Sequence, residues 1–133
     1  MSEENVEMVR QYFAAYERGG LEASAEFWHP DINWRAIEGT LDDVGVMRGP
    51  DAMRHYYGQW EETFEDVRTE TEELIDAGDQ VVAVVRGIGR MKGSDAEVDI
   101  RYAIVFSLRD GKIGMGREFA SREQALEAAG LRE

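Results

Sequence analysis

The chain has 133 residues, with 28 acidic and 15 basic side chains, a formal net charge of -13 and no cysteine. This length fits a single domain, which we expect to span residues 1–133. The negative charge argues against nucleic acid or an anionic membrane as a partner. The lack of cysteine excludes disulfides and thiolate metal ligands. No apolar run approaches the length of a membrane span, so we expect a cytoplasmic protein.

The first third of the chain has the periodicity of helices. Val6, Val9, Phe13 and Tyr16 recur on one helical face. The elements expected in order are a helix ending at Gly19-Gly20, a short helix that contains Trp28 and ends at Pro30, a strand over residues 32–37, a polar loop over 38–48, and a helix that opens at Gly49-Pro50.

From residue 66 onward the apolar residues alternate with a period of two, which is typical of strands. Asp110-Gly111 is a strong hairpin signal, and Ser121 is placed to cap a final helix that Gly130 ends. The pattern predicts an α+β fold, in which N-terminal helices cover one face of a curved antiparallel β-sheet and a short helix ends the chain. The strands are expected over residues 66–76, 80–92, 97–108 and 113–120.

Several segments resemble the SnoaL-like (polyketide cyclase-like) branch of the NTF2-like superfamily. The segments are VRQYFAAYERGGLEA, FWHPDINW, RGPDAMRHYY, ELIDAGDQVVAVVRG, VFSLRDGKI and REQALEAAGL. The resemblance covers nearly the whole chain and implies a cone-shaped sheet that helices close around an apolar cavity. It leaves the chemistry open, because members include isomerases, cyclases, epoxide hydrolases, dehydratases and domains without a known activity.

Aromatic side chains fall on the stripes that would face such a cavity. Rings that carry a polar group suit an apolar wall that also orients a ligand, although ordinary core packing accounts for each ring taken alone. The residues expected to line the cavity are Tyr16, Trp34, Met53, Tyr57, Trp60, Phe64, Ile100, Tyr102, Ile104 and Phe106.

Two characterised enzymes of this fold can be compared residue by residue. The resemblance to ketosteroid isomerase places Tyr12 at its oxyanion-hole tyrosine, but its two aspartates fall at Ala36 and near Ile104. That activity is not expected in its known form, because no base is left to remove a proton. The resemblance to limonene-epoxide hydrolase places Glu118 at one catalytic carboxylate and its arginine near Arg86, whereas the second aspartate is absent.

Glu118, Tyr12 and Arg86 are therefore the candidate catalytic residues. A Glu118 that faces the cavity would be a general acid or base; the alternative is an outward glutamate paired with Arg117 or Arg101. Strand alternation places Gly116 beside Glu118, where its small size is expected to leave space in the cavity. A bulge beside the Asp110-Gly111 hairpin, which the resemblance favours, is expected to shift the parity of one strand and so put Glu118 on the same side as Tyr102. Without the bulge, Phe106 would pair with Met115.

Two functions from different classes remain. One is an acid/base enzyme, a lyase, isomerase or hydrolase, that acts without a cofactor on a small, largely apolar organic molecule. The other is a non-catalytic ligand-binding or association domain. No metal site is expected, because His29 and His55 are the only histidines and are widely separated.

A homodimer is also expected. Strands that are apolar on both faces need a second cover, and a two-fold partner is the commonest one. The residues assigned to the outer face are Val98, Val105, Ile113, Met115 and Phe119.

Overall fold

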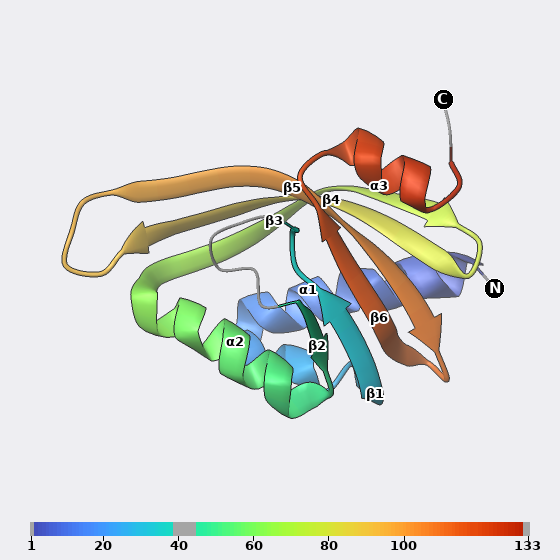
Figure 1. Cartoon of the computed structure of the whole chain (residues 1–133), viewed down its shortest axis with the longest axis horizontal. Coiled ribbons are helices and arrows are strands. Elements are labelled where there is room, and N and C mark those ends of the chain that lie inside the picture. The colour runs from blue at the N-terminus through green and yellow to red at the C-terminus, as the bar shows by residue number, and fades with distance from the viewer. Residues whose placement is uncertain (1, 39–44, 132–133) are drawn as a thin grey trace.

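The computed structural model describes residues 2–38 and 45–131 and has the expected α+β architecture (Figure 1). A curved sheet has helices α1 and α2 on one face, here called the inner face, and helix α3 on the other, the outer face (Figure 1). The elements are α1 (Ser2–Ala25), β1 (Trp28–Arg35), β2 (Val46–Arg48), α2 (Pro50–Thr63), β3 (Phe64–Ala77), β4 (Gln80–Met91), β5 (Glu97–Arg109), β6 (Lys112–Phe119) and α3 (Arg122–Ala128).

The strand order in the described sheet is β2-β1-β6-β5-β4-β3. The antiparallel sheet expected from the sequence needs one correction, because β1 runs parallel to β6 while the other pairs are antiparallel. Short hairpins join β3, β4, β5 and β6 in sequence, and a hairpin makes its two strands antiparallel. The connection from β1 to β6 is long, so these two strands can run parallel.

Helix α1 bends at Gly20, where φ is 72° and the residue leaves the helical conformation. The break expected there is confirmed. After Gly20 the chain is helical again, but only as far as Ala25, where α1 ends. Trp28 and Pro30 belong to β1, so the expected second helix is too long. Sheet pairing decides the outcome: the Ile113 amide donates to the Phe27 carbonyl at 2.8 Å, just before β1 begins.

The sequence predicted that this strand would start at residue 32. In the structure β1 starts earlier, at Trp28. The polar loop expected over residues 38–48 contains the short strand β2, which pairs with β1. Residues 39–44 of that loop lie outside the described residues.

The β5–β6 hairpin fixes the side on which Glu118 lies. Asp110 and Gly111 both have positive φ, 53° and 75°, as a type I′ turn requires. The register shifts beside this hairpin, so Ile104 stands opposite Glu118 and Phe106 opposite Gly116. The expected bulge is confirmed, and it puts Glu118 on the inner face.

Helix α3 covers part of the outer face, which the N-terminal helices leave open. Ser121 Oγ accepts the Gln124 amide at 3.2 Å, which confirms the predicted cap. Ala125 and Leu126 of α3 are buried against Val82 and Val105 of the sheet. The chain itself therefore covers part of the apolar outer surface.

The residues assigned to the outer face have different fates. Val105 is buried under α3, and Phe119 packs against the same cluster. Ile113 lies in the main core, whereas Met115 keeps 46% of its surface exposed. Only part of this set is left for a second subunit to cover.

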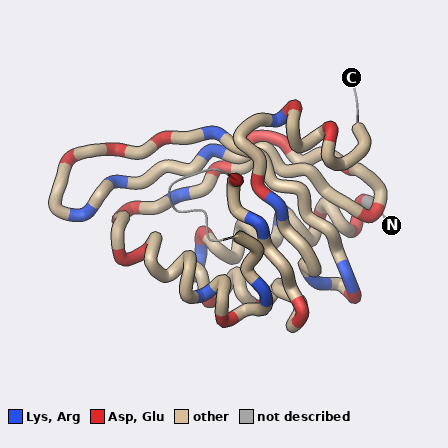
Figure 2. Tube along the Cα trace, in the orientation of Figure 1, with Lys and Arg blue, Asp and Glu red and all other residues tan. Residues whose placement is uncertain are grey.

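Beyond α3, the outer face carries paired charges. Arg86 pairs with Asp99 at 2.5 Å, and Arg101 pairs with Glu72 at 3.1 Å. Figure 2 shows the basic residues of β4 beside the acidic residues of β5 along this part of the sheet. Within residues 2–38 and 45–131, no helix combines the length and the apolar character needed to cross a membrane.

Candidate functional site

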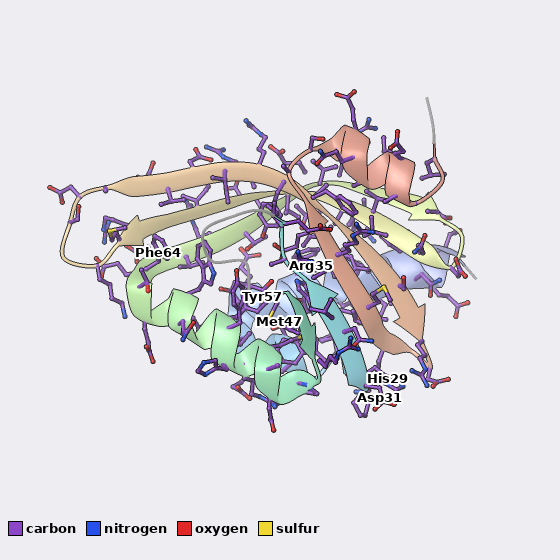
Figure 3. All side chains as sticks on the ribbon, viewed as in Figure 1. His29, Asp31, Arg35, Met47, Tyr57 and Phe64 are labelled. Atoms are coloured by element: carbon purple, nitrogen blue, oxygen red, sulfur yellow. The ribbon has the colours of Figure 1, made fainter. Side chains whose placement is uncertain are left out.

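A cavity of 380 Å³ lies between the two inner helices and the inner face of the sheet. Figure 3 shows Tyr57 between α2 and the sheet, and Phe64 where α2 gives way to β3. Most of the cavity wall is apolar or aromatic. Glu118 adds a carboxylate to this wall from the inner face of β6. Of the residues expected from the sequence, the cavity brings together Tyr12, Tyr16, Trp34, Tyr57, Trp60, Phe64, Ile100, Tyr102, Ile104 and Glu118.

The Glu118 carboxylate receives two neutral hydrogen-bond donors on the same oxygen. Trp34 Nε1 donates to Oε2 at 2.9 Å, and the Tyr57 hydroxyl donates to it at 2.5 Å. Hydrogen bonds to an ionised acceptor are stronger than those between neutral groups, and they favour the charged form. The two donors therefore suit a carboxylate oxygen that carries negative charge.

Gly116 positions the Trp34 donor. The two residues stand opposite each other in the parallel β1–β6 pair. A Cβ on Gly116 would lie 2.2 Å from the Trp34 ring, so only glycine leaves room for the indole. The space that the sequence analysis assigned to the cavity at Gly116 is therefore filled by Trp34. The Trp34 ring lies over Gly116, which is two residues before Glu118 on the same face of β6. The indole N–H therefore reaches the Glu118 carboxylate.

Several tyrosines around the cavity keep their protons. Burial raises the pKa of Tyr12, Tyr57 and Tyr102, and the negative charge of Glu118 raises each of them further. Burial, followed by the charge of Glu61, also raises the pKa of Tyr16. These hydroxyls are therefore hydrogen-bond donors at neutral pH. Tyr57 gives its proton to Glu118, whereas Tyr12, Tyr16 and Tyr102 can donate to an oxygen on a bound molecule.

Two glycines of β4 open the space in front of β3 and β5. A Cβ on Gly87 would reach Tyr102 at 3.5 Å, and one on Gly89 would reach Val67 at 3.5 Å. Both positions face the cavity. Sequence analysis missed this role, because an isolated glycine in a strand predicts only a bend or a close approach.

Three of the expected site residues lie elsewhere. Arg86 is on the outer face, because alternation along β4 turns it away from its inward neighbour Gly87, and its guanidinium pairs with Asp99 and Glu70. Met53 and Phe106 are fully buried in the main core and do not line the cavity. Arg86, the arginine expected beside Glu118, is thus absent from this wall, although Arg68 of β3 lines it.

Other lining residues were missed by the sequence analysis. Val98 was assigned to the outer face, although it has the same strand parity as Ile100 and so belongs inside. Trp28 was assigned to a helix, so its place at the start of β1 and in the cavity wall was hidden. The further lining residues are Phe13, Leu21, Ser24, Ala36, Ile37, Tyr56, Glu61, Val67, Arg68, Thr69, Gly87, Ile88 and Gly89.

The histidines take no part in this wall. His29 Nδ1 accepts the Asp31 amide at 3.0 Å, a local contact within β1. Figure 3 shows both residues at the end of β1 that lies away from Arg35. Across the part of the chain that the structure describes, no three His, Cys, Asp or Glu residues are grouped to hold a metal ion.

Comparison with known proteins places this geometry in a family. The family model described as SnoaL-like domain matches residues 9–114. Uncharacterised proteins of Mycobacterium tuberculosis and Mycobacterium bovis are 29% identical over 126 residues, which is 93% of this chain and 94% of theirs. None of these matches by itself names a reaction.

Solved structures share the fold. An NTF2-like protein from Burkholderia thailandensis superposes with a TM-score of 0.77 at 25% identity, covering 95% of each chain. TerC, co-crystallised with polyporic acid, superposes with a TM-score of 0.76 at 19% identity, covering 96% of this chain and 98% of its own.

Proposed function

Since the chain belongs to the family of SnoaL-like domains, we propose that it binds a small, largely apolar organic molecule in the inner cavity and uses Glu118 as a general base. The observation that carries this proposal is a carboxylate in an apolar wall with two neutral donors on one oxygen. TerC, a protein of the same fold, was co-crystallised with polyporic acid, which supports the binding of a small molecule by this fold.

The proposed chemistry follows from the groups present. Glu118 takes a proton from a carbon next to a carbonyl or from a water molecule. Trp34 and Tyr57 hold the carboxylate in its charged form before the transfer and keep it oriented. The neutral hydroxyls of Tyr12 and Tyr102 stabilise the oxygen on which negative charge then develops. The class is a lyase, isomerase or hydrolase that relies on its own side chains.

The test uses 1-tetralone as a probe, because exchange of its α-hydrogens in D2O reports proton removal without knowledge of the natural substrate. Binding is first measured by calorimetry. Exchange at saturating protein is then followed by proton NMR. We expect the wild type to accelerate exchange and Glu118→Gln to lower the rate by about 100-fold or more, the usual contribution of a positioned base.

Glu97→Gln is the matched control, because Glu97 is an exposed strand glutamate outside the cavity. It should exchange like the wild type, and circular dichroism should show all three proteins folded. If the wild type binds 1-tetralone and exchanges it no faster than Glu118→Gln, the base is ruled out. The non-catalytic ligand-binding domain then becomes the better account.

A homodimer remains a second proposal, independent of the chemistry. Met115 and Val46 are 46% and 47% exposed and lie on the edge formed by β6, β1 and β2. A partner on this edge would remove both from water. Light scattering at micromolar concentration should give twice the chain mass, and Met115→Glu should shift it to the monomer. A monomeric wild type contradicts the proposal.

A further inference from the structure

A buried donor in the cavity wall has no hydrogen-bond partner among the described residues. Only 4% of Trp28 is exposed, and its indole N–H makes no hydrogen bond with any residue the structure describes. Trp28 lines the cavity from the start of β1. Proteins pair nearly all their buried donors, so an unpaired one at a cavity is a feature that needs an explanation.

The polar group that this N–H can serve is the Tyr12 hydroxyl. Both residues line the cavity and belong to the same apolar cluster. An N–H donated to this oxygen would oppose the rise that burial causes in the pKa of Tyr12, and Trp28 acts on Tyr12 in that direction without a completed hydrogen bond. A small movement of the Tyr12 ring toward Trp28 would complete it.

The two groups differ in what they can do. An indole N–H only donates, whereas a tyrosine hydroxyl both donates and accepts. Once the Tyr12 oxygen accepts from Trp28, its proton must point elsewhere, and the cavity is the open direction. We propose that Trp28 is a positioning residue that fixes Tyr12 as a donor, so that the cavity selects molecules carrying a carbonyl oxygen. This inference rests on the proposed ligand binding, but not on Glu118 being a base.

Charge favours a neutral acceptor over an anion. The negative charge of Glu118 acts on Tyr12, Tyr57 and Tyr102 alike. An anionic group placed among these hydroxyls would meet that charge across a poorly screened interior. A carbonyl oxygen accepts the Tyr12 proton without this repulsion. Bound in this way, it extends a chain of hydrogen bonds from Trp28 through Tyr12, in which each bond strengthens the next.

The test compares 2-acetylnaphthalene with 2-ethylnaphthalene, which differ by the carbonyl oxygen alone. Calorimetry gives the preference for the ketone as the ratio of the two dissociation constants. Trp28→Phe removes the N–H and keeps an aromatic ring, and we expect the preference to fall about three- to tenfold, as for one neutral hydrogen bond. Tyr12→Phe should lower it at least as far. Phe119→Leu, which alters a ring of the outer-face cluster and not of the cavity wall, should leave the preference unchanged.

The carbonyl stretching frequency of the bound ketone separates positioning from packing. It should be lowest in the wild type, higher in Trp28→Phe and highest in Tyr12→Phe. A purely structural Trp28 would weaken both probes equally and leave the frequency where it was, which would overturn the inference. If Trp28→Phe does not fold, an unchanged preference in Tyr12→Phe overturns it instead.

The two proposals fail in different ways. Loss of the ketone preference in Trp28→Phe supports this inference even if Glu118→Gln exchanges like the wild type. If the wild type binds neither naphthalene, the ligand class and the positioning role both fall.

Discussion

The inner and outer faces of the sheet treat their carboxylates in opposite ways. On the outer face, Asp99 pairs with Arg86 at 2.5 Å, and the guanidinium lowers the pKa of that carboxyl. On the inner face, Glu118 instead receives Trp34 and Tyr57, which carry no charge. An arginine partner neutralises the negative charge of a carboxylate. Neutral donors orient the carboxylate without neutralising its charge. The same side-chain type is thus a surface ion pair in one setting and a candidate base in the other.

The largest expected effect is on stability at alkaline pH, because buried tyrosine hydroxyls lie on the inner face. Tyr12, Tyr57 and Tyr102 have raised pKa values in the folded protein. Above pH ~10 the unfolded chain releases protons that the folded chain retains, so stability falls as pH rises. Each retained proton costs about 1.4 kcal/mol per pH unit, or about 4 kcal/mol for the three. Urea unfolding between pH 8 and 11 measures the slope; a flat profile contradicts the burial of these groups.

Tyr57→Phe should have the next largest effect, because it removes one donor from the half-buried Glu118 carboxylate. We expect a loss of about 2 kcal/mol, the range of hydrogen bonds to charged groups. Urea unfolding at pH 7 measures it. The same variant should reduce the alkaline slope by about one third. A loss no greater than that of an exposed ion pair would mean that the two faces do not differ.

Gly116→Ala tests how the inner donors are positioned. The added methyl group cannot coexist with the Trp34 ring 2.2 Å away, so the indole must move from Glu118. We expect a destabilisation of about 1–2 kcal/mol, as for other overpacked sites. Gly58→Ala is the matched control, because Gly58 lies inside α2 with open space around its Cβ, and it should stabilise by about 0.5–1 kcal/mol. Equal behaviour of the two variants would refute a role for Gly116.

The smallest effect is expected on the outer face. Arg101→Gln breaks the pair with Glu72 at 3.1 Å, in which the arginine side chain is 66% exposed. Such pairs contribute less than about 1 kcal/mol and are screened by salt. The change in unfolding free energy should vanish at high salt. A loss as large as that of Tyr57→Phe would contradict the contrast between the faces.

The long strands could be predicted from the sequence because local signals determine them. The Asp110-Gly111 turn and the period of two place β5 and β6 within a residue of their observed bounds. Glu118 then faces inward through the bulge beside that turn. Trp28 could not be placed in the same way, because its position depends on pairing with β6, which is distant in sequence. The partner of Glu118 was mistaken for the same reason: the Trp34 donor depends on a parallel pairing and on the small size of Gly116.

The pair Gly87 and Gly89 has a consequence for how such a protein could change its preferences over evolution. A methyl group at either position would meet its neighbours at 3.5 Å or more, an ordinary contact distance, and would protrude into the empty volume. Each carbon added at Gly87 or Gly89 would therefore reduce the cavity volume, and with it the size of the ligand that fits. Glu118 and its two donors would stay in place. Homologues with alanine or valine at these positions would accept progressively smaller molecules while keeping the same chemistry.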